Sequence, residues 1–295
     1  MKTIRAKWQK ELLQQVSETV TFVRQRQHPH WRTMWEYAIG QRPLVPSALQ
    51  SRSDIHVYDS NLIWQTILIK NGALTLDVPD FWVHFKRYYP NAGELSALIR
   101  SLLRFFWLKG GFQNEIRLAD RYARIVGFCP VRVGYEILPN PHVTEEGEEA
   151  GEEVLEAESV WMEQPVIRHV SPLRFFFDLD IPVTDLEYAR WCCEVLYLTK
   201  EQLRALPYRE LDEIQPTAKR SDIVSPISGH QREYYEIWSI WDKESGTRIL
   251  YAPSVPDKVI EIEEVTTPFP GFFPYEIWTI YEIPDYPFAM SEVEL

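Results

Sequence analysis

The spacing of the apolar residues changes near residue 128, and this change most restricts the folds open to the chain. Before it, apolar residues recur every three or four positions, as they do within residues 94–109. After it, they alternate with polar or small residues, as they do within residues 131–135. The first spacing is typical of helices and the second of half-buried strands. We therefore predict an α+β fold, in which N-terminal helices over residues 1–127 pack against a mostly antiparallel β-sheet formed by residues 128–295.

Four segments of the N-terminal part have helical spacing. In the first of them Pro29 stands between His28 and His30, and we expect an interruption there because proline disrupts a helix interior. Gly110 and Gly111 are expected to end the third, whose apolar residues form one stripe. The helices are predicted over residues 3–39, 61–76, 94–109 and 115–126, with a strand-like extended stretch over 74–90.

The C-terminal part is predicted to consist of short strands and hairpins. A turn of suitable composition separates two aromatic, β-branched runs within residues 234–252, which predicts a hairpin. Thr199 and Gln202 have the spacing of a capping box and predict the start of a short helix. The strands are predicted over residues 131–135, 159–170, 173–177, 189–198, 234–252 (the hairpin), 258–265 and 275–281.

The charge balance restricts the partners that the chain can bind. It has 31 Lys and Arg against 43 Asp and Glu, a formal net charge of −12. A protein that binds DNA through phosphates needs a basic surface, so a DNA-gripping domain is not expected. An acidic wall repels phosphate, however, and passage of DNA along it without sticking remains compatible with this balance.

Cysteine usage and hydropathy indicate a cytosolic setting. The three cysteines are odd in number, and Cys192 and Cys193 are adjacent, so no disulfide framework is visible. The pair lies in an apolar strand, where buried thiols are inert; a redox role for the adjacent thiols is the alternative. No signal peptide and no stretch long enough to span a bilayer is present in the sequence given.

An acidic run over residues 144–158 stands between two predicted strands. It holds eight glutamates and no cation. Like charges repel, so we interpret the run as an exposed, solvated hairpin tip. A site for a cation or a basic partner is the alternative.

Asp178 and Asp180 are the candidates for a metal or catalytic site. Two carboxylates separated by one residue could bind Mg²⁺ or Ca²⁺, with Asp185 and Glu187 close in sequence. The alternation with apolar residues and the proline that follows also suit a strand that leaves the core and turns. We favour the structural interpretation, and we predict no catalytic residue, no metal ligand and no cofactor.

Other candidate sites have structural explanations of the same kind. His28 and His30 could offer two imidazoles to a metal, but no ligand set of recognised spacing accompanies them. Glu236 and Trp238 combine residue types found in sugar-binding enzymes, yet strand alternation places both on one face of a strand. Phosphate-binding glycine motifs, the nucleophile elbow and the zinc-protease motif do not occur in the sequence.

The order of the segments resembles the portal, or head–tail connector, proteins of short-tailed bacteriophages. The matching stretches are "NLIWQTILIKNGALT", "DRYARIVGFCPVRVGYEI", "VSPLRFFFDLDIPVTDLEYARWCCEVLYLTKEQLRAL", "YEIWSIWDKESGTRILYA" and "PGFFPYEIW", in that order. The resemblance implies a ring of about twelve copies at one capsid vertex. It also implies contacts with capsid protein, terminase and a tail adaptor, passage of double-stranded DNA through the channel, no chemistry of its own, and a place in the virion after assembly in the host cytoplasm.

The resemblance covers only the part of a portal known as the wing. Stem, clip and crown segments are expected beyond the last residues, where Ser291 begins a pattern typical of a helix start. We therefore expect the polypeptide to be a fragment, or the product of a gene interrupted before a helical region.

Surplus aromatic residues are the candidates for contacts between copies. Aromatics make up 14% of the chain, and such side chains need burial in their own core or against a neighbour. Core packing is the competing role for each candidate. The candidate aromatics are Trp31, Trp35, Phe175, Phe176, Phe177, Phe269, Phe272 and Phe273.

The alternatives for the function of the whole chain are a carbohydrate-active or other hydrolase that uses Asp178 or Asp180, and a monomeric phage head or tail adaptor.

Overall fold

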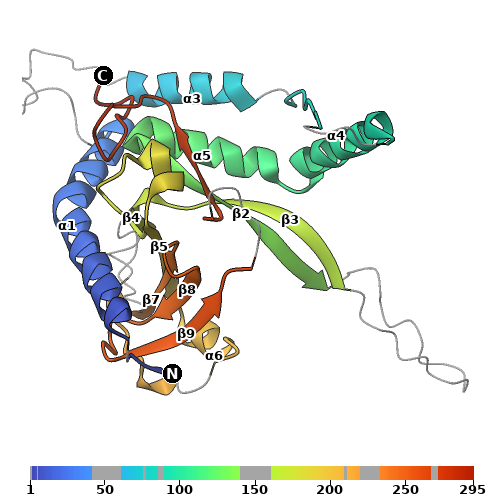
Figure 1. Ribbon diagram of the computed structural model, residues 1–295. Coiled ribbons are helices and arrows are strands. Elements are labelled where there is room, and N and C mark those ends of the chain that lie inside the picture. Colours follow the sequence, from blue (N-terminus) through green and yellow to red (C-terminus); the bar gives the residue numbers. More distant parts are fainter. Residues whose placement is uncertain are drawn as a thin grey trace, which may run out of the picture.

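The computed structural model has the predicted α+β class, with helices and antiparallel sheets (Figure 1). It describes residues 2–4, 6–41, 61–75, 78–85, 90–139, 161–208, 211–219, 233–266 and 272–295. The acidic run over 144–158 and Phe269, both singled out in the sequence, lie outside these residues. No helix within them combines the length and the apolar character needed to cross a membrane.

The helices of the N-terminal part form in the predicted order. The pair α4 and α5 is joined by Gly110 and Gly111, as expected, and Gly111 adopts a φ of 76°, which favours glycine. In Figure 1, α1 runs along one side of the strands, while α3, α4 and α5 lie together at one end of the molecule. The bounds are Lys7–Ala38 for α1, Leu62–Thr75 for α3, Ala92–Lys109 for α4 and Phe112–Val126 for α5.

The strands form two antiparallel sheets rather than one. The larger sheet has the order β1-β9-β8-β7-β5-β4, with β6 paired to β7, and the smaller has the order β10-β2-β3. The division arises because β10 pairs with the first half of β2, Tyr275 opposite Arg132, and not with the preceding hairpin. The bounds are Lys2–Thr3 (β1), Phe128–Pro139 (β2), Trp161–His169 (β3), Phe175–Phe177 (β4), Trp191–Leu198 (β5), Ala218–Lys219 (β6), Glu233–Asp242 (β7), Thr247–Tyr251 (β8), Lys258–Glu264 (β9) and Tyr275–Thr279 (β10).

Several local predictions for the β-rich part are confirmed. The hairpin forms as β7 and β8, and Ser245 N–H donates to Asp242 Oδ2 in its turn at 3.1 Å. Both hydrogen bonds of the capping box join Thr199 and Gln202 at the start of α6, Lys200–Arg204. Residues 78–85, in contrast, form no strand, because no partner strand lies beside them among the described residues.

The prediction of an interruption at Pro29 is wrong, because α1 continues through it to Ala38. Proline removes one helical hydrogen bond and costs about 3 kcal/mol in a helix interior. Burial on the core side of the same turns offsets this cost, since Trp31 is only 2% exposed. The helix therefore keeps its apolar face aligned with the sheet on both sides of the proline.

The main core lies between α1 and the larger sheet and extends between the two sheets. Leu12, Val16 and Val20 of α1 are at most 2% exposed. Phe176 of β4 faces α1, whereas its neighbours Phe175 and Phe177 face the smaller sheet and approach Tyr275 and Phe128. A second, smaller core under α6 contains Leu203, Leu211, Ile214, Ile237, Leu250, Ala252 and Ile260.

The C-terminal segment packs on the end of α5. Gly127, which ends this helix, has a φ of 108°, and a side chain there would collide with the carbonyl of Ala289. Glu292 N–H donates to Arg124 O at 2.7 Å. Ser291 and Glu294 form two reciprocal hydrogen bonds, at 2.7 and 3.1 Å, in the pattern of a capping box.

Candidate functional site

Asp178 and Asp180 lie in the turn that follows β4. Asp180 N–H donates to Asp178 Oδ1 at 3.3 Å, and Asp178 N–H donates to the carbonyl of Trp191 at 3.2 Å. These contacts close a turn and tie it to β5. Within the described part of the chain, no group of three or more His, Cys, Asp or Glu side chains is arranged to hold a metal ion.

The two histidines beside Pro29 lie in different environments. His28 is buried next to the rings of Trp31 and Phe176, at centroid distances of 5.5 and 5.8 Å. Burial, together with the nearby positive charge of Arg24, lowers its pKa to about 3. His30 is exposed, with Nε2 placed 2.6 Å from Glu294 Oε1. The two imidazoles therefore do not converge on a common ligand.

The cysteines are enclosed by apolar side chains. Cys129, Cys192 and Cys193 are each 0% exposed. Burial raises the pKa of all three thiols, which favours the unreactive protonated form. Their environment is that of structural cysteines.

Most of the candidate aromatics pack inside a single copy. Trp31 meets Phe128 and Phe288 edge-on, at centroid distances of 5.6 and 5.3 Å. The three phenylalanines of β4 are each 1% exposed, so they are part of the core. These contacts are those of core packing, the alternative to a role in contacts between copies.

Two of the remaining candidates, Trp35 and Phe272, are half-buried, and Phe273 is buried. Trp35 is half-buried against Tyr122, with ring centroids 5.4 Å apart. Phe273 is 4% exposed. Phe272 is half-buried beside Trp241 and has a φ of 79°, a strained conformation for a phenylalanine. Phe269 belongs to the residues that the structure does not describe.

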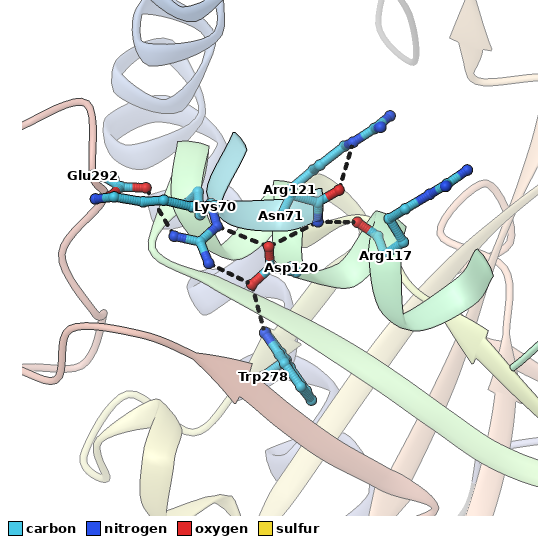
Figure 2. A network of polar contacts seen from close by, with 8 residues as sticks. Lys70, Asn71, Arg117, Asp120, Arg121, Trp278 and Glu292 are labelled. Atoms are coloured by element: carbon cyan, nitrogen blue, oxygen red, sulfur yellow. Dashed lines mark hydrogen bonds and ion pairs between the residues drawn. The ribbon is translucent and has the colours of Figure 1, made fainter. Parts of the chain in front are cut away.

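A buried polar network joins α3, α5, β10 and the C-terminal segment (Figure 2). Its centre is Asp120, which is 0% exposed and accepts hydrogen bonds from Asn71 Nδ2 at 2.8 Å and Trp278 Nε1 at 3.4 Å. Arg124 pairs with Asp120 and reaches Glu292 Oε2 at 3.1 Å. Lys70 also pairs with Glu292. The network holds four distant segments together and leaves the Asp120 carboxylate enclosed.

A second buried cluster joins α1 to the larger sheet. Arg24 Nη2 donates to Glu236 Oε1 at 2.6 Å, and Trp238 Nε1 donates to the same oxygen at 2.5 Å. Glu236 and Trp238 thus share one face of β7, as strand alternation predicted. Burial lowers the pKa of Arg24, but the charges of Tyr197 and Glu236 outweigh it and leave the pKa raised.

A cavity of about 310 Å³ opens between the two sheets. On its wall, Glu194 accepts from Tyr275 Oη at 2.6 Å and from Arg132 Nη1 at 3.2 Å. Arg248 lies over the Trp241 ring, 5.5 Å from its centroid, and its Nη1 is 3.4 Å from Glu263 Oε2. These charged groups are therefore already paired within the chain.

The most unusual surface of the described chain is the outer face of α4. Leu98, Leu102, Phe105 and Leu108, which we call the α4 apolar stripe, are 57%, 46%, 55% and 53% exposed. Every described side chain of α4 is at least partly exposed. The sequence predicted a single stripe, which the structure divides: Leu98 and Leu102 lie on the exposed face, and the other predicted members are half-buried. Those other members are Leu95, Ile99, Leu103 and Phe106. The signal was available, because apolar residues surround nearly the whole helix, a pattern typical of a helix buried on all sides.

Comparisons with known proteins add no identification. No protein-family model matches the sequence, and no curated protein matches it.

Proposed function

We propose that this chain is a structural subunit without enzymatic activity that assembles with further copies of itself. We further propose that it is the wing part of a tailed-phage portal, the class that its segment order resembles. In that role it would help to connect capsid and tail, and double-stranded DNA would pass through the ring during packaging and ejection. Capsid protein, terminase and a tail adaptor are the corresponding partners, and the virion is the proposed location.

The observation that carries the proposal of assembly is the α4 apolar stripe. Its four side chains, each about half exposed, follow one another along the helix. Soluble monomers rarely expose contiguous apolar patches of this kind, and such patches mark surfaces that another molecule covers. A helix with apolar residues on its inner and outer sides is suited to burial between two subunits.

The arrangement of the buried carboxylates favours a structural role over a catalytic role. Asp120, Glu194 and Glu236 are each at most 8% exposed. Each of them contacts an arginine from the same chain, at 2.8, 3.2 and 2.6 Å respectively. A catalytic acid or base must come within hydrogen-bonding distance of a substrate, whereas Asp120 and Glu236 are enclosed and connect elements of the fold. Glu194 lines the cavity between the sheets, but Tyr275 and Arg132 already bind its carboxylate.

The proposal is tested by measuring the mass of the purified chain with multi-angle light scattering over a range of concentrations, and by imaging the particles with negative-stain electron microscopy. We expect a concentration-dependent species of several copies, with closed or curved particles in the images. A species of one chain's mass at every concentration would contradict the proposal and favour the monomeric adaptor. Hydrolysis of an oligosaccharide library, lost in Asp178→Asn, would favour the enzyme.

A further inference from the structure

The helix α4, which carries the α4 apolar stripe, lies at the end of the helical layer away from α1 (Figure 1). The opposite side of α4 is the one that packs on the rest of the chain. Phe106 stacks on Phe112 of α5 at 6.0 Å between ring centroids, and Ser96 Oγ donates to the carbonyl of Val83 at 2.9 Å. The stripe takes no part in these two contacts and is about half exposed, so within the described residues it presents an apolar surface that another molecule could cover.

Positive charge accompanies the stripe. Arg104 is exposed on α4 one turn before Leu108, on the side of the stripe. Arg100 lies one turn after Ser96, on the packing side, where its guanidinium is 5.6 Å from the ring centroid of Trp82, which is 71% exposed. The helical part as a whole is basic, since residues 1–127 hold 18 Lys and Arg against 10 Asp and Glu. Residues 128–295 hold 13 Lys and Arg against 33 Asp and Glu. Charge complementarity therefore favours the β-rich part of another copy as the partner of α4.

One region of the β-rich part combines exposed aromatic rings with exposed carboxylates. Tyr188 is 69% exposed and Tyr286 is 47% exposed. They lie on two segments that the hydrogen bond from Val183 N–H to Pro287 O joins at 2.9 Å. The same two segments carry four exposed acidic side chains. We call this region the acidic tyrosine patch: Asp185, Glu187, Tyr188, Glu282, Asp285 and Tyr286.

The stripe and the patch lie toward opposite ends of α5. The end of α4 is two residues from Phe112, where α5 begins, and the C-terminal segment reaches Arg124 near the end of α5 through Glu292. A helix of this length spans about 22 Å. The two surfaces of one copy therefore do not meet each other, but those of two copies can.

We propose that the α4 apolar stripe of one copy docks on the acidic tyrosine patch of a second copy. This inference rests on the proposed function and specifies its interface. Leucine and phenylalanine side chains would cover the tyrosine rings, while Arg104 would approach the surrounding carboxylates. Because the two surfaces differ, the contact is heterologous, and its repetition gives a ring where the rotation closes.

Two variants remove one surface each. The stripe variant is Leu98→Gln, Leu102→Gln and Phe105→Gln, in which glutamine keeps a high helix propensity at exposed positions. The patch variant is Tyr188→Ser and Tyr286→Ser. We expect each variant alone to associate at least about 100-fold more weakly than the wild type, because interface aromatic and apolar anchors dominate binding.

Mixing the two variants gives the sharpest test. The patch variant retains its stripe and the stripe variant retains its patch, so together they have one complete interface. We expect a one-to-one complex in the mixture, measured by light scattering and by analytical ultracentrifugation, and no larger particle. Phe22→Gln on α1 and Tyr135→Ser on β2, at positions 49% and 72% exposed, are matched controls that should assemble as the wild type does.

The failures of the two proposals are distinguishable. If the wild type assembles and both variants still assemble, the interface is wrong while the proposal of assembly stands. If the stripe variant is monomeric but the patch variant assembles, the stripe meets another surface and the inference is overturned. A wild type that stays monomeric overturns the proposed function itself. Circular dichroism and thermal unfolding like those of the wild type establish that each variant is folded.

Discussion

Arg124 donates two hydrogen bonds to the carboxylate of Asp120, one turn earlier on α5: Nε to Oδ2 at 2.8 Å and Nη2 to Oδ1 at 3.2 Å. Both side chains are almost fully buried, with 9% and 1% of their surfaces exposed. Burial lowers the pKa of Arg124, but hydrogen bonds with Asp120 and Glu292 outweigh it and raise the pKa above its ordinary value. The pair is thus the ionic centre of the network that joins the helical layer to β10 and the C-terminal segment.

Removal of the Asp120 carboxylate should destabilise the whole chain. In Asp120→Ala the buried guanidinium of Arg124 loses its main counter-charge, and breaking a buried pair in this way costs about 3–5 kcal/mol. Urea unfolding monitored by circular dichroism measures the change. Glu11→Ala is a matched control, because Lys7 and Glu11 form the same four-residue spacing on an exposed surface, and it should have no measurable effect. An equal, small effect of both substitutions would contradict this role for the network.

The sequence predicts the centre of this network only in part. The spacing of four residues between Asp120 and Arg124 is visible in the sequence and typical of a helical ion pair. Their burial depends on Asn71, Trp278 and Glu292, which come from segments far apart along the chain. Local spacing therefore predicts the elements, whereas contacts across 49 to 168 residues decide which of their side chains are enclosed.

The same distinction explains the differences in the fold. The order of helices and strands follows from apolar spacing and turn residues, which are local, and it was predictable. The second sheet depends on the pairing of β10 with β2, which are separated by more than a hundred residues. At Pro29 the local rule is overridden, because burial of Trp31 stabilises a continuous helix. Which face of α4 remains uncovered likewise depends on the placement of α5, which the sequence of α4 does not contain.

His28 should make the chain sensitive to mild acid. Its pKa is about 3 in the folded chain, against an ordinary value of 6.5 that applies to the unfolded chain. Between these values the unfolded chain binds a proton that the folded chain does not, so stability is lost as the pH falls below 6.5. The loss is about 2 kcal/mol by pH 5, at about 1.4 kcal/mol per pH unit.

The variant His28→Phe isolates this contribution. It should lose about 2 kcal/mol less than the wild type between pH 7 and pH 5, because phenylalanine has no proton to bind and suits the site beside Trp31 and Phe176. Urea unfolding at pH 8, 7 and 5 measures the difference. The two proteins should have the same pH dependence between pH 8 and 7, and parallel curves down to pH 5 would contradict the assignment.

Tyr275 and Glu194 should stabilise the contact between the two sheets. The phenol donates to Glu194 Oε2 at 2.6 Å, and burial followed by the charge of Glu194 raises the pKa of Tyr275 well above its ordinary value. Tyr275→Phe should cost about 1.5–3 kcal/mol, the range for a hydrogen bond to a charged group. Tyr208→Phe removes a 3.1 Å bond to Glu263 nearer the surface and should cost clearly less, as measured by urea unfolding. The reverse order of the two costs would contradict this assignment.

Replacement of Asp178 and Asp180 by asparagine should leave the free energy of unfolding almost unchanged. The Oδ1 acceptor that closes the turn is retained in Asp178→Asn, and Asp180 is exposed, so the double variant with Asp180→Asn should change the free energy of unfolding by less than about 0.5 kcal/mol. Asp178→Ala, which removes the acceptor, should cost about 0.5–1.5 kcal/mol.

A carboxylate pair that bound a cation would behave differently, because a ligand that binds only the folded chain raises its stability in proportion to the logarithm of the ligand concentration. Thermal unfolding in millimolar Ca²⁺ or Mg²⁺ therefore decides between a turn and a metal site: the turn predicts equal shifts in the wild type and the double variant, and stabilisation of the wild type alone would establish the metal site.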